Sequence, residues 1–373
     1  MAQRPGSDSQ RSARGPVYGG QRGIKMLILA AFLLGASLVG EIGHQAGGAP
    51  SAEVENQIDS AQKLMQAREF GKALEVLTAL MQRQQAPPPD AFILMATCQL
   101  NLDQTAKAIE AFERGMSLYP KEQVLEEFYV TLLTNYIPIE QMKQKLEAAL
   151  AASPRSLVLL RAAAFVQLRL DSRSEQARRL VDALLEIAPD NPNSHYIFGQ
   201  WAVLNHQEEL AIREWEKTLT LASADARMQM DVYTLIGDAE NRLNRAERAE
   251  TAFKKALQAN ASLEKPNPAS AFFYAEFLVR QSRFEESQTV VEQILGWAPR
   301  YGPALLQRAL HLARTNKPEE AIVAAENALS ASDLNPEQIR AAHVLLAKTY
   351  FLLKRTADAE RHQQWLKSQG VND

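Results

Sequence analysis

The chain has 373 residues, of which 46% are hydrophobic and 23% are charged, and its formal net charge is −3. This is the composition of an ordinary globular protein, which argues against wholesale disorder and against a membrane protein with many spans. The nearly balanced charge argues against a general nucleic-acid binder, and a single cysteine rules out an internal disulfide framework and any CxxC zinc or redox site.

Charge is distributed unevenly along the chain. Residues 1–25 contain five basic side chains and one acidic side chain, residues 26–40 contain no charge, and the remainder therefore carries −7. Residues 1–23 are rich in Gly, Ser, Arg and Gln and cannot bury enough apolar surface to offset chain entropy, so we expect a disordered basic tail there.

Residues 24–43 form a nearly continuous apolar run that predicts a transmembrane anchor. At 1.5 Å per residue this run spans about 30 Å, which is the thickness of the hydrocarbon core of a bilayer. An uncleaved or cleaved signal peptide, a buried helix and an organelle transit segment remain alternatives. Because basic residues precede the run and acidic residues follow it, the N-terminus is expected in the cytoplasm. Residues 44–52 have the composition of a flexible linker, and the rest of the chain would then lie on the periplasmic or extracytoplasmic side.

From residue 53 to about residue 369 the sequence shows a helical period and almost no β signal. A small residue is followed four positions later by a bulky one and seven positions later by a small or apolar one. Clear copies of this pattern begin at Ala73, Ala108, Ala211, Ala249, Ala321 and Ala359, and weaker copies begin at Met142, Ala177 and Ser287.

Two further features recur around these nine starting points. A small residue usually stands twelve positions earlier, and a proline often stands twelve positions later, as at Pro120, Pro154, Pro189 and Pro299. Small side chains let two antiparallel helices approach closely, and proline cannot continue a helix. The pattern therefore predicts a series of helix-turn-helix units. Spacings of 38 residues predict exposed loops at about 222–229, 258–268 and 330–338.

This pattern resembles the tetratricopeptide repeat, a helix-turn-helix unit of 34 residues. The repeat that begins near Met230 matches best, with Gly237, Ala249 and Phe253 at the family's small and aromatic positions. The copies at 123–154 and 155–189 depart most; the former has Val130 and Met142 where small residues belong. The resemblance implies an all-α solenoid over residues 53–369. About nine repeats would form a right-handed superhelix with a concave inner surface, preceded by one transmembrane helix.

A search for catalytic chemistry finds no convergent set of residues. The chain lacks the common metalloprotease, phosphate-loop, nucleophile-elbow and dinucleotide motifs, and no histidine has a second histidine or a cysteine three or four residues away. Cys98 and Trp215 are interpreted as packed core residues. We therefore expect no enzyme activity, no cofactor, no metal, no nucleic acid and no small-molecule substrate; an enzyme with an unrecognised site is the less favoured alternative.

The resemblance implies that positions 2, 5, 9, 12 and 13 of the first helix in each repeat face inward. Counted from repeat starts at 192, 230, 268, 302 and 340, these positions give the following expected groove residues: Tyr196, Gln200, Thr234, Asp238, Asn241, Arg242, Phe272, Glu276, Arg280, Leu306, Arg314, Lys348 and Phe351. Three arginines share position 13 in consecutive repeats. They are either a ladder that receives carboxylates of a partner or solvated cations at helix ends.

These observations favour a membrane-anchored, non-enzymatic scaffold that presents its groove to a protein or peptide partner. By family analogy, its expected setting is cell-envelope assembly, secretion or polysaccharide export. The alternative is a cytosol-facing or organelle-anchored adaptor, co-chaperone or regulatory subunit. The Lys at position 5 and the Asn at position 9 that bind chaperone tails in this family are missing here.

Overall fold

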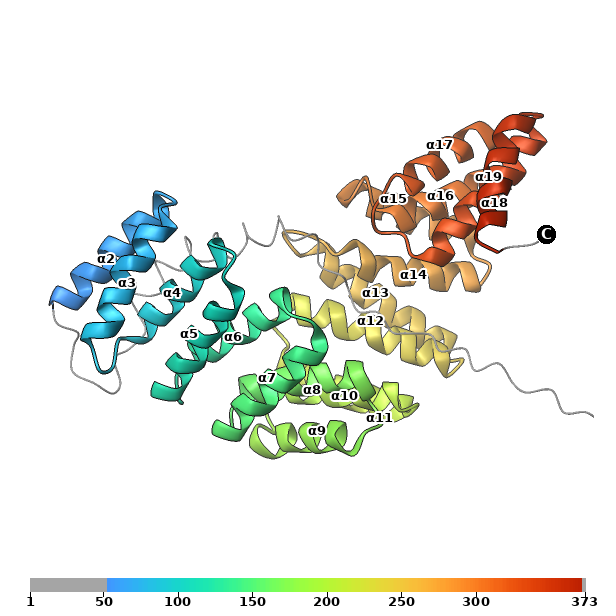
Figure 1. Cartoon of the computed structure of the whole chain (residues 1–373). Coiled ribbons are helices and arrows are strands. Elements are labelled where there is room, and N and C mark those ends of the chain that lie inside the picture. The colour runs from blue at the N-terminus through green and yellow to red at the C-terminus, as the bar shows by residue number, and fades with distance from the viewer. Residues whose placement is uncertain (1–51, 371–373) are drawn as a thin grey trace, which may run out of the picture. The chain divides into compact units, whose positions relative to one another are not determined.

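The computed structural model describes residues 52–370, and within this range the chain forms eighteen α-helices and no strand (Figure 1). The all-α solenoid expected from the sequence is confirmed in this respect. The predicted tail, the predicted anchor and nearly all of the predicted linker lie outside the described residues. Within residues 52–370, no helix has the length and apolar character needed to cross a membrane.

The chain divides into two compact units, one ending at Ile187 and one beginning at Ala188. The first unit holds four helix pairs: α2 (Ala52–Gln66) and α3 (Phe70–Arg83), α4 (Pro89–Asn101) and α5 (Thr105–Leu118), α6 (Gln123–Tyr136) and α7 (Ile139–Ala152), α8 (Leu157–Asp171) and α9 (Glu175–Ile187).

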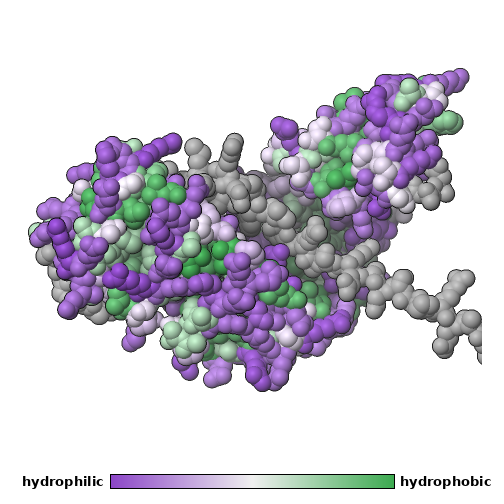
Figure 2. All heavy atoms as spheres, in the orientation of Figure 1, coloured by the Kyte–Doolittle hydropathy of each residue, from purple (hydrophilic) through white to green (hydrophobic). Residues whose placement is uncertain are grey.

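The second unit holds five helix pairs: α10 (Pro192–Leu204) and α11 (Glu208–Leu221), α12 (Ala226–Arg242) and α13 (Ala246–Ala261), α14 (Pro268–Arg280) and α15 (Phe284–Trp297), α16 (Gly302–Arg314) and α17 (Pro318–Leu329), α18 (Pro336–Leu352) and α19 (Thr356–Ser368). The nine pairs of the described range match the expected number of repeats. Figure 2 shows that hydrophilic side chains cover most of the visible face, with smaller hydrophobic areas between them.

Prolines and polar caps set the ends of many helices. Helices α5, α7, α9 and α15 each end two residues before a proline, as the sequence predicts. Five helices of the second unit begin with proline in their first turn, where its missing N–H has no helical acceptor to lose. Asn335 caps α18 through a reciprocal pair of hydrogen bonds with Gln338.

Most pairs turn through a single left-handed residue. Seven such residues have φ between 57° and 60°: Arg68, Asp103, His206, Asn244, Ser282, Asn316 and Lys354. None is glycine, so each side chain is held in a backbone region that costs L-residues about 1–2 kcal/mol.

The close helix contacts expected from the small residues are present. A Cβ added to Gly237 in α12 would lie 2.7 Å from two ring carbons of Phe253 in α13, and one added to Gly199 in α10 would lie 2.2 Å from the indole nitrogen of Trp215 in α11. Phe253 is 3% exposed and Trp215 is fully buried. A bulky residue on one helix therefore fills the space that glycine leaves on its partner.

The third pair departs from this geometry, as its sequence suggests. Helices α6 and α7 contact each other at few positions, and α6 packs mainly on α5 and α8. Val130 and Met142 stand where the other pairs have small residues, and their bulk prevents the close approach. The turn between α6 and α7 passes through Ile137 and Pro138 in extended conformation, with no left-handed residue.

The prediction of three exposed loops is wrong in part, because much of the additional length extends helices. Residues 226–229 belong to α12, which begins early because the Asp225 side chain accepts a hydrogen bond from the Met228 amide. Residues 258–261 belong to α13 and residues 336–338 belong to α18. After α13, the Asn260 side chain bonds both the amide and the carbonyl of Asn267, which closes the remaining loop tightly.

Candidate partner-binding surface

The first helices of the second unit bring equivalent positions together. Helix α12 packs beside α14, and α16 packs beside α18 (Figure 1). The equivalent positions 9, 12 and 13 of the repeat recur on each of these helices. We refer to the residues at these three positions of α10, α12, α14, α16 and α18 as the inner surface.

Three of the expected groove residues are buried and serve packing. Thr234, Phe272 and Leu306, all at position 5, are 7%, 8% and 5% exposed. The Thr234 hydroxyl is 2.6 Å from the Ser270 hydroxyl on α14, and the Phe272 ring meets the Tyr301 ring edge-on at 5.9 Å. A partner bound at the surface would therefore make little contact with these three residues at position 5.

The other ten expected residues are accessible to different degrees. The half-buried ones are Tyr196, Gln200, Asp238, Asn241 and Glu276, and the exposed ones are Arg242, Arg280, Arg314, Lys348 and Phe351. All ten occupy first helices, so a partner that crossed the second unit could contact several of them.

Two of the three arginines at position 13 already face a carboxylate. Arg242 lies 2.7 Å from Asp238, and Arg280 lies 3.9 Å from Glu276, in each case four residues earlier on the same helix. Such exposed pairs contribute little to stability, but they balance the local charge. The three arginines therefore do not form a uniform strip of unpaired positive charge.

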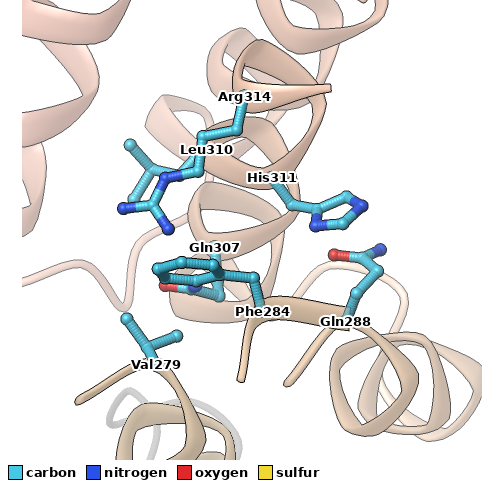
Figure 3. A pocket seen from close by; sticks show the side chains of 7 residues that line it. All are labelled: Val279, Phe284, Gln288, Gln307, Leu310, His311 and Arg314. Atoms are coloured by element: carbon cyan, nitrogen blue, oxygen red, sulfur yellow. The ribbon is translucent and has the colours of Figure 1, made fainter. Parts of the chain in front are cut away.

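Arg314 has a different environment, because Leu310 occupies the position where the other two repeats carry an acid. Its guanidinium carbon lies 3.9 Å from the centroid of the Phe284 ring, at the start of α15 (Figure 3). A small pocket lies between three helices here. It is lined by Val279 from α14, Phe284 and Gln288 from α15, and Gln307, Leu310, His311 and Arg314 from α16.

One polar atom of this pocket is buried without a hydrogen-bond partner. The Gln288 amide nitrogen donates to Glu292, and this contact leaves the amide oxygen of Gln288 buried and unsatisfied. His311 presents Nε2 to the Glu285 carboxylate at 3.9 Å. The sequence analysis missed Phe284, Gln288 and His311, because the pocket depends on how α15 sits between α14 and α16.

The last pair carries a further residue that the sequence analysis missed. Leu352, at position 13 of α18, is 77% exposed, and its neighbour Phe351, at position 12, is 65% exposed. The sequence was sufficient to predict Leu352 as a groove residue, because it occupies the same repeat position as Arg314. Lys348 and Arg314 have no ion-pair partner among residues 52–370.

Two titratable groups that are buried elsewhere, His195 and Cys98, have structural roles. His195 bonds the Glu214 carboxylate and the Pro189 carbonyl, each at 2.7 Å. Cys98 is fully buried, and burial raises the pKa of its thiol to about 12, as befits a packed core residue. Among the described residues, no three His, Cys, Asp or Glu side chains gather in a way that could hold a metal ion.

His343 and His362 join the last two helices. Their Nδ1 atoms are 2.9 Å apart, and the His343 ring stacks on Trp365 with a centroid distance of 3.8 Å. Burial is the main cause that lowers the pKa of both imidazoles, so both favour the neutral form. One ring can then donate its Nδ1–H to the other, which holds α19 on α18.

Comparison with known proteins places two helix pairs in a defined family. The family model described as tetratricopeptide repeat matches residues 89–122 and 231–263, which hold most of α4–α5 and α12–α13. No curated protein gives a significant match to the chain.

Several solved structures share the fold at low sequence identity. A tetratricopeptide repeat protein from Parabacteroides merdae is 14% identical, with 69% of this chain and 98% of that chain covered and a TM-score of 0.51. A chain of the APC/C hetero-tetramer Cut9–Hcn1 is 13% identical, with 78% of this chain and 55% of that chain covered and a TM-score of 0.51. Pseudomonas aeruginosa PilF is 17% identical, with 61% and 93% covered and a TM-score of 0.48. At these identities the likeness concerns the fold alone.

Proposed function

Since the chain belongs to the tetratricopeptide repeat family, we propose that it is a non-enzymatic scaffold that binds a protein or peptide partner on its inner surface. The observation that carries this proposal is the repetition of accessible polar and charged side chains at positions 9, 12 and 13 of the first helices, joined by the exposed Phe351 in the last pair. A repeated row on packed helices offers one chain segment several contacts at regular spacing.

The finer part of the proposal concerns location and pathway. The basic residues before the apolar run at 24–43 and the acidic body after it support a membrane anchor with the repeats on the extracytoplasmic side. A scaffold in that position would serve cell-envelope assembly, secretion or polysaccharide export.

Capture of the partner in cells tests the scaffold. A variant carrying Arg242→Glu, Arg280→Glu and Arg314→Glu should recover much less crosslinked protein than wild type at equal expression. Reversing three charges disturbs every charge-assisted contact at position 13, each worth about 1.5–3 kcal/mol when well formed, although such contributions rarely add fully.

A second triple variant is the matched control. Arg114, Arg248 and Arg300 are exposed, and none lies on a first helix, so changing all three to Glu alters the net charge equally and leaves the inner surface intact. Equal recovery from wild type and both variants would show that position 13 takes no part in binding. Absence of any crosslinked partner with wild type would count against the scaffold itself.

The orientation across the membrane needs a separate test. Cys98 is too deeply buried to report it, so we suggest Gly296→Cys, because Gly296 is exposed and nothing lies within 4 Å of an added Cβ. Labelling of this cysteine by a membrane-impermeant maleimide in intact spheroplasts is expected for extracytoplasmic repeats. Labelling only after lysis would favour the cytosol-facing adaptor.

A further inference from the structure

The two most exposed large hydrophobic side chains of the described residues are neighbours in sequence. Phe351 is 65% exposed and Leu352 is 77% exposed, and both lie at the end of α18 on the inner surface. Adjacent large apolar side chains in water are unfavourable unless something covers them, so they point to a binding surface.

The apolar character continues onto the neighbouring helices. Leu310 at position 9 and Ala313 at position 12 of α16 are half-buried, as is Val279 at position 12 of α14. Val279 lines the small pocket together with Leu310, and Ala313 packs on a hydrophobic cluster that includes Leu346 and Tyr350 of α18. Helix α16 therefore connects Val279 on α14 with the helix that carries Phe351 and Leu352. We call these five residues the apolar patch. The corresponding positions 9 and 12 of α12 carry Asp238 and Asn241, so the change in character occurs within the unit.

Three cations lie close in sequence to residues of the apolar patch, on α16, on α18 and in the turn after α18. Lys348 stands at position 9 of α18, Arg314 at position 13 of α16, and Lys354 in the turn after α18. None of the three has an ion-pair partner among residues 52–370, whereas Arg242 and Arg280 each face a carboxylate on their own helix. The last two pairs therefore combine exposed apolar surface with uncompensated positive charge.

We propose that the apolar patch binds a chain segment whose apolar side chains are flanked by Asp or Glu, and that Arg314, Lys348 and Lys354 receive those carboxylates. The inference rests on the proposed scaffold function and specifies the chemistry of its partner. Covering Phe351 and Leu352 supplies affinity, and the three cations select for acidic flanks and set the orientation of the segment. The cations are spread over neighbouring helices, which fits a segment that crosses them.

Selection from a random peptide library tests this chemistry without knowledge of the natural partner. The full chain, purified in a nonionic detergent, is immobilised and used to select phage that display random twelve-residue peptides. The recovered sequences are expected to combine Leu, Ile or Phe with Asp or Glu. A peptide with a blocked carboxyl end is then synthesised from the enriched sequence, and its Kd is measured by fluorescence anisotropy.

Two double variants and two controls locate the binding. The variant Phe351→Ser with Leu352→Ser and the variant Arg314→Glu with Lys348→Glu should each bind the peptide at least tenfold more weakly than wild type. All four changes are on accessible side chains, so helical content measured by circular dichroism should not change. The controls are Val323→Ser, which removes an exposed hydrophobic side chain from α17, and Arg300→Glu, which reverses an exposed charge between α15 and α16; both should bind as wild type does.

Several outcomes would overturn the inference. Recovery of basic or uncharged peptides would show that the apolar patch does not recognise acidic apolar segments. Binding of the peptide by both double variants as tightly as by wild type would show the same. If no peptide is recovered but vesicles of phosphatidylglycerol and phosphatidylcholine bind wild type and not the variants, the patch is a lipid-binding surface instead. Peptides that bind through α10 or α12 would leave the scaffold standing and refute only this inference, whereas failure of both the selection and the crosslinking would refute both.

Discussion

Replacement of Gly237 by alanine tests whether the helix pairs depend on the contact between glycine and the aromatic ring. The added Cβ would lie 2.7 Å from Cδ1 and Cε1 and 2.9 Å from Cζ of Phe253. Ordinary carbon contacts begin near 3.4 Å, so the ring must retreat by about 0.5–0.7 Å. It has little room to do so, because it packs against the rings of Tyr274 and Phe277 at centroid distances of 6.0 and 5.3 Å.

Two opposing effects set the size of the change. Alanine in a helix is favoured over glycine by up to about 1 kcal/mol. Overpacking of a filled core costs about 1–3 kcal/mol, and a rigid aromatic cluster gives values toward the upper end. Gly237→Ala should therefore lower the free energy of unfolding by about 1–2 kcal/mol.

Gly296→Ala is the matched control, because Gly296 is also helical but has nothing within 4 Å of an added Cβ. This variant should unfold at the same temperature as wild type or slightly above it. The two proteins are compared by their midpoints of thermal and urea unfolding, both measured by the helical circular dichroism signal. Midpoints are the appropriate quantity because a repeat array need not unfold in a single step. Equal midpoints for Gly237→Ala and Gly296→Ala would refute the close-contact argument. The double variant Gly237→Ala with Phe253→Leu should recover part of the stability lost in Gly237→Ala, because the smaller leucine side chain leaves room for the added Cβ.

Three further changes test a left-handed turn residue, Arg68, and two titratable side chains, His343 and Glu250. Arg68→Gly relieves a left-handed residue with φ of 60° and should raise stability by about 0.5–1 kcal/mol in urea unfolding, whereas Arg68→Ala should give no gain. Burial, and then the nearby His362, lower the pKa of His343 from 6.5 to about 4, so its contribution is complete above pH 6.5 and is lost as the pH falls toward 4. The thermal midpoint of wild type should therefore fall more steeply over this range than that of His343→Phe, and parallel profiles would contradict the assignment. Hydrogen bonds from Arg283 and then Lys254 hold the pKa of the Glu250 carboxyl at about 2, so its contribution is present above pH 4.5 and is lost as the pH falls toward 2. The thermal midpoint of Glu250→Gln should therefore lie furthest below that of wild type near neutral pH, and the difference should disappear at low pH.

The helix pairs could be predicted from the sequence because their determinants are local. A helical period, a proline after the second helix and a small residue opposite a bulky one each act within a stretch of about 34 residues. Gly237 and Phe253 were identified from spacing alone, and the structure places them in contact. The pairing of Arg242 with Asp238 was also within reach of the sequence, because residues four apart meet on a helix.

The tertiary structure decided three features that the sequence did not predict. These are the burial of the residues at position 5, the lengths of α12, α13 and α18, and the environment of Arg314. Thr234 and Phe272 are buried because neighbouring first helices approach each other at that position, a distance that no single repeat specifies. Arg314 stacks on Phe284 because α16 packs against α15 of the preceding pair. Periodicity within one repeat defines which face of a helix is apolar, but the rotation and separation of adjacent repeats depend on side-chain packing between them. That packing leaves Phe351 and Leu352 in solvent and Leu306 in the core, although all three stand at positions expected to face inward.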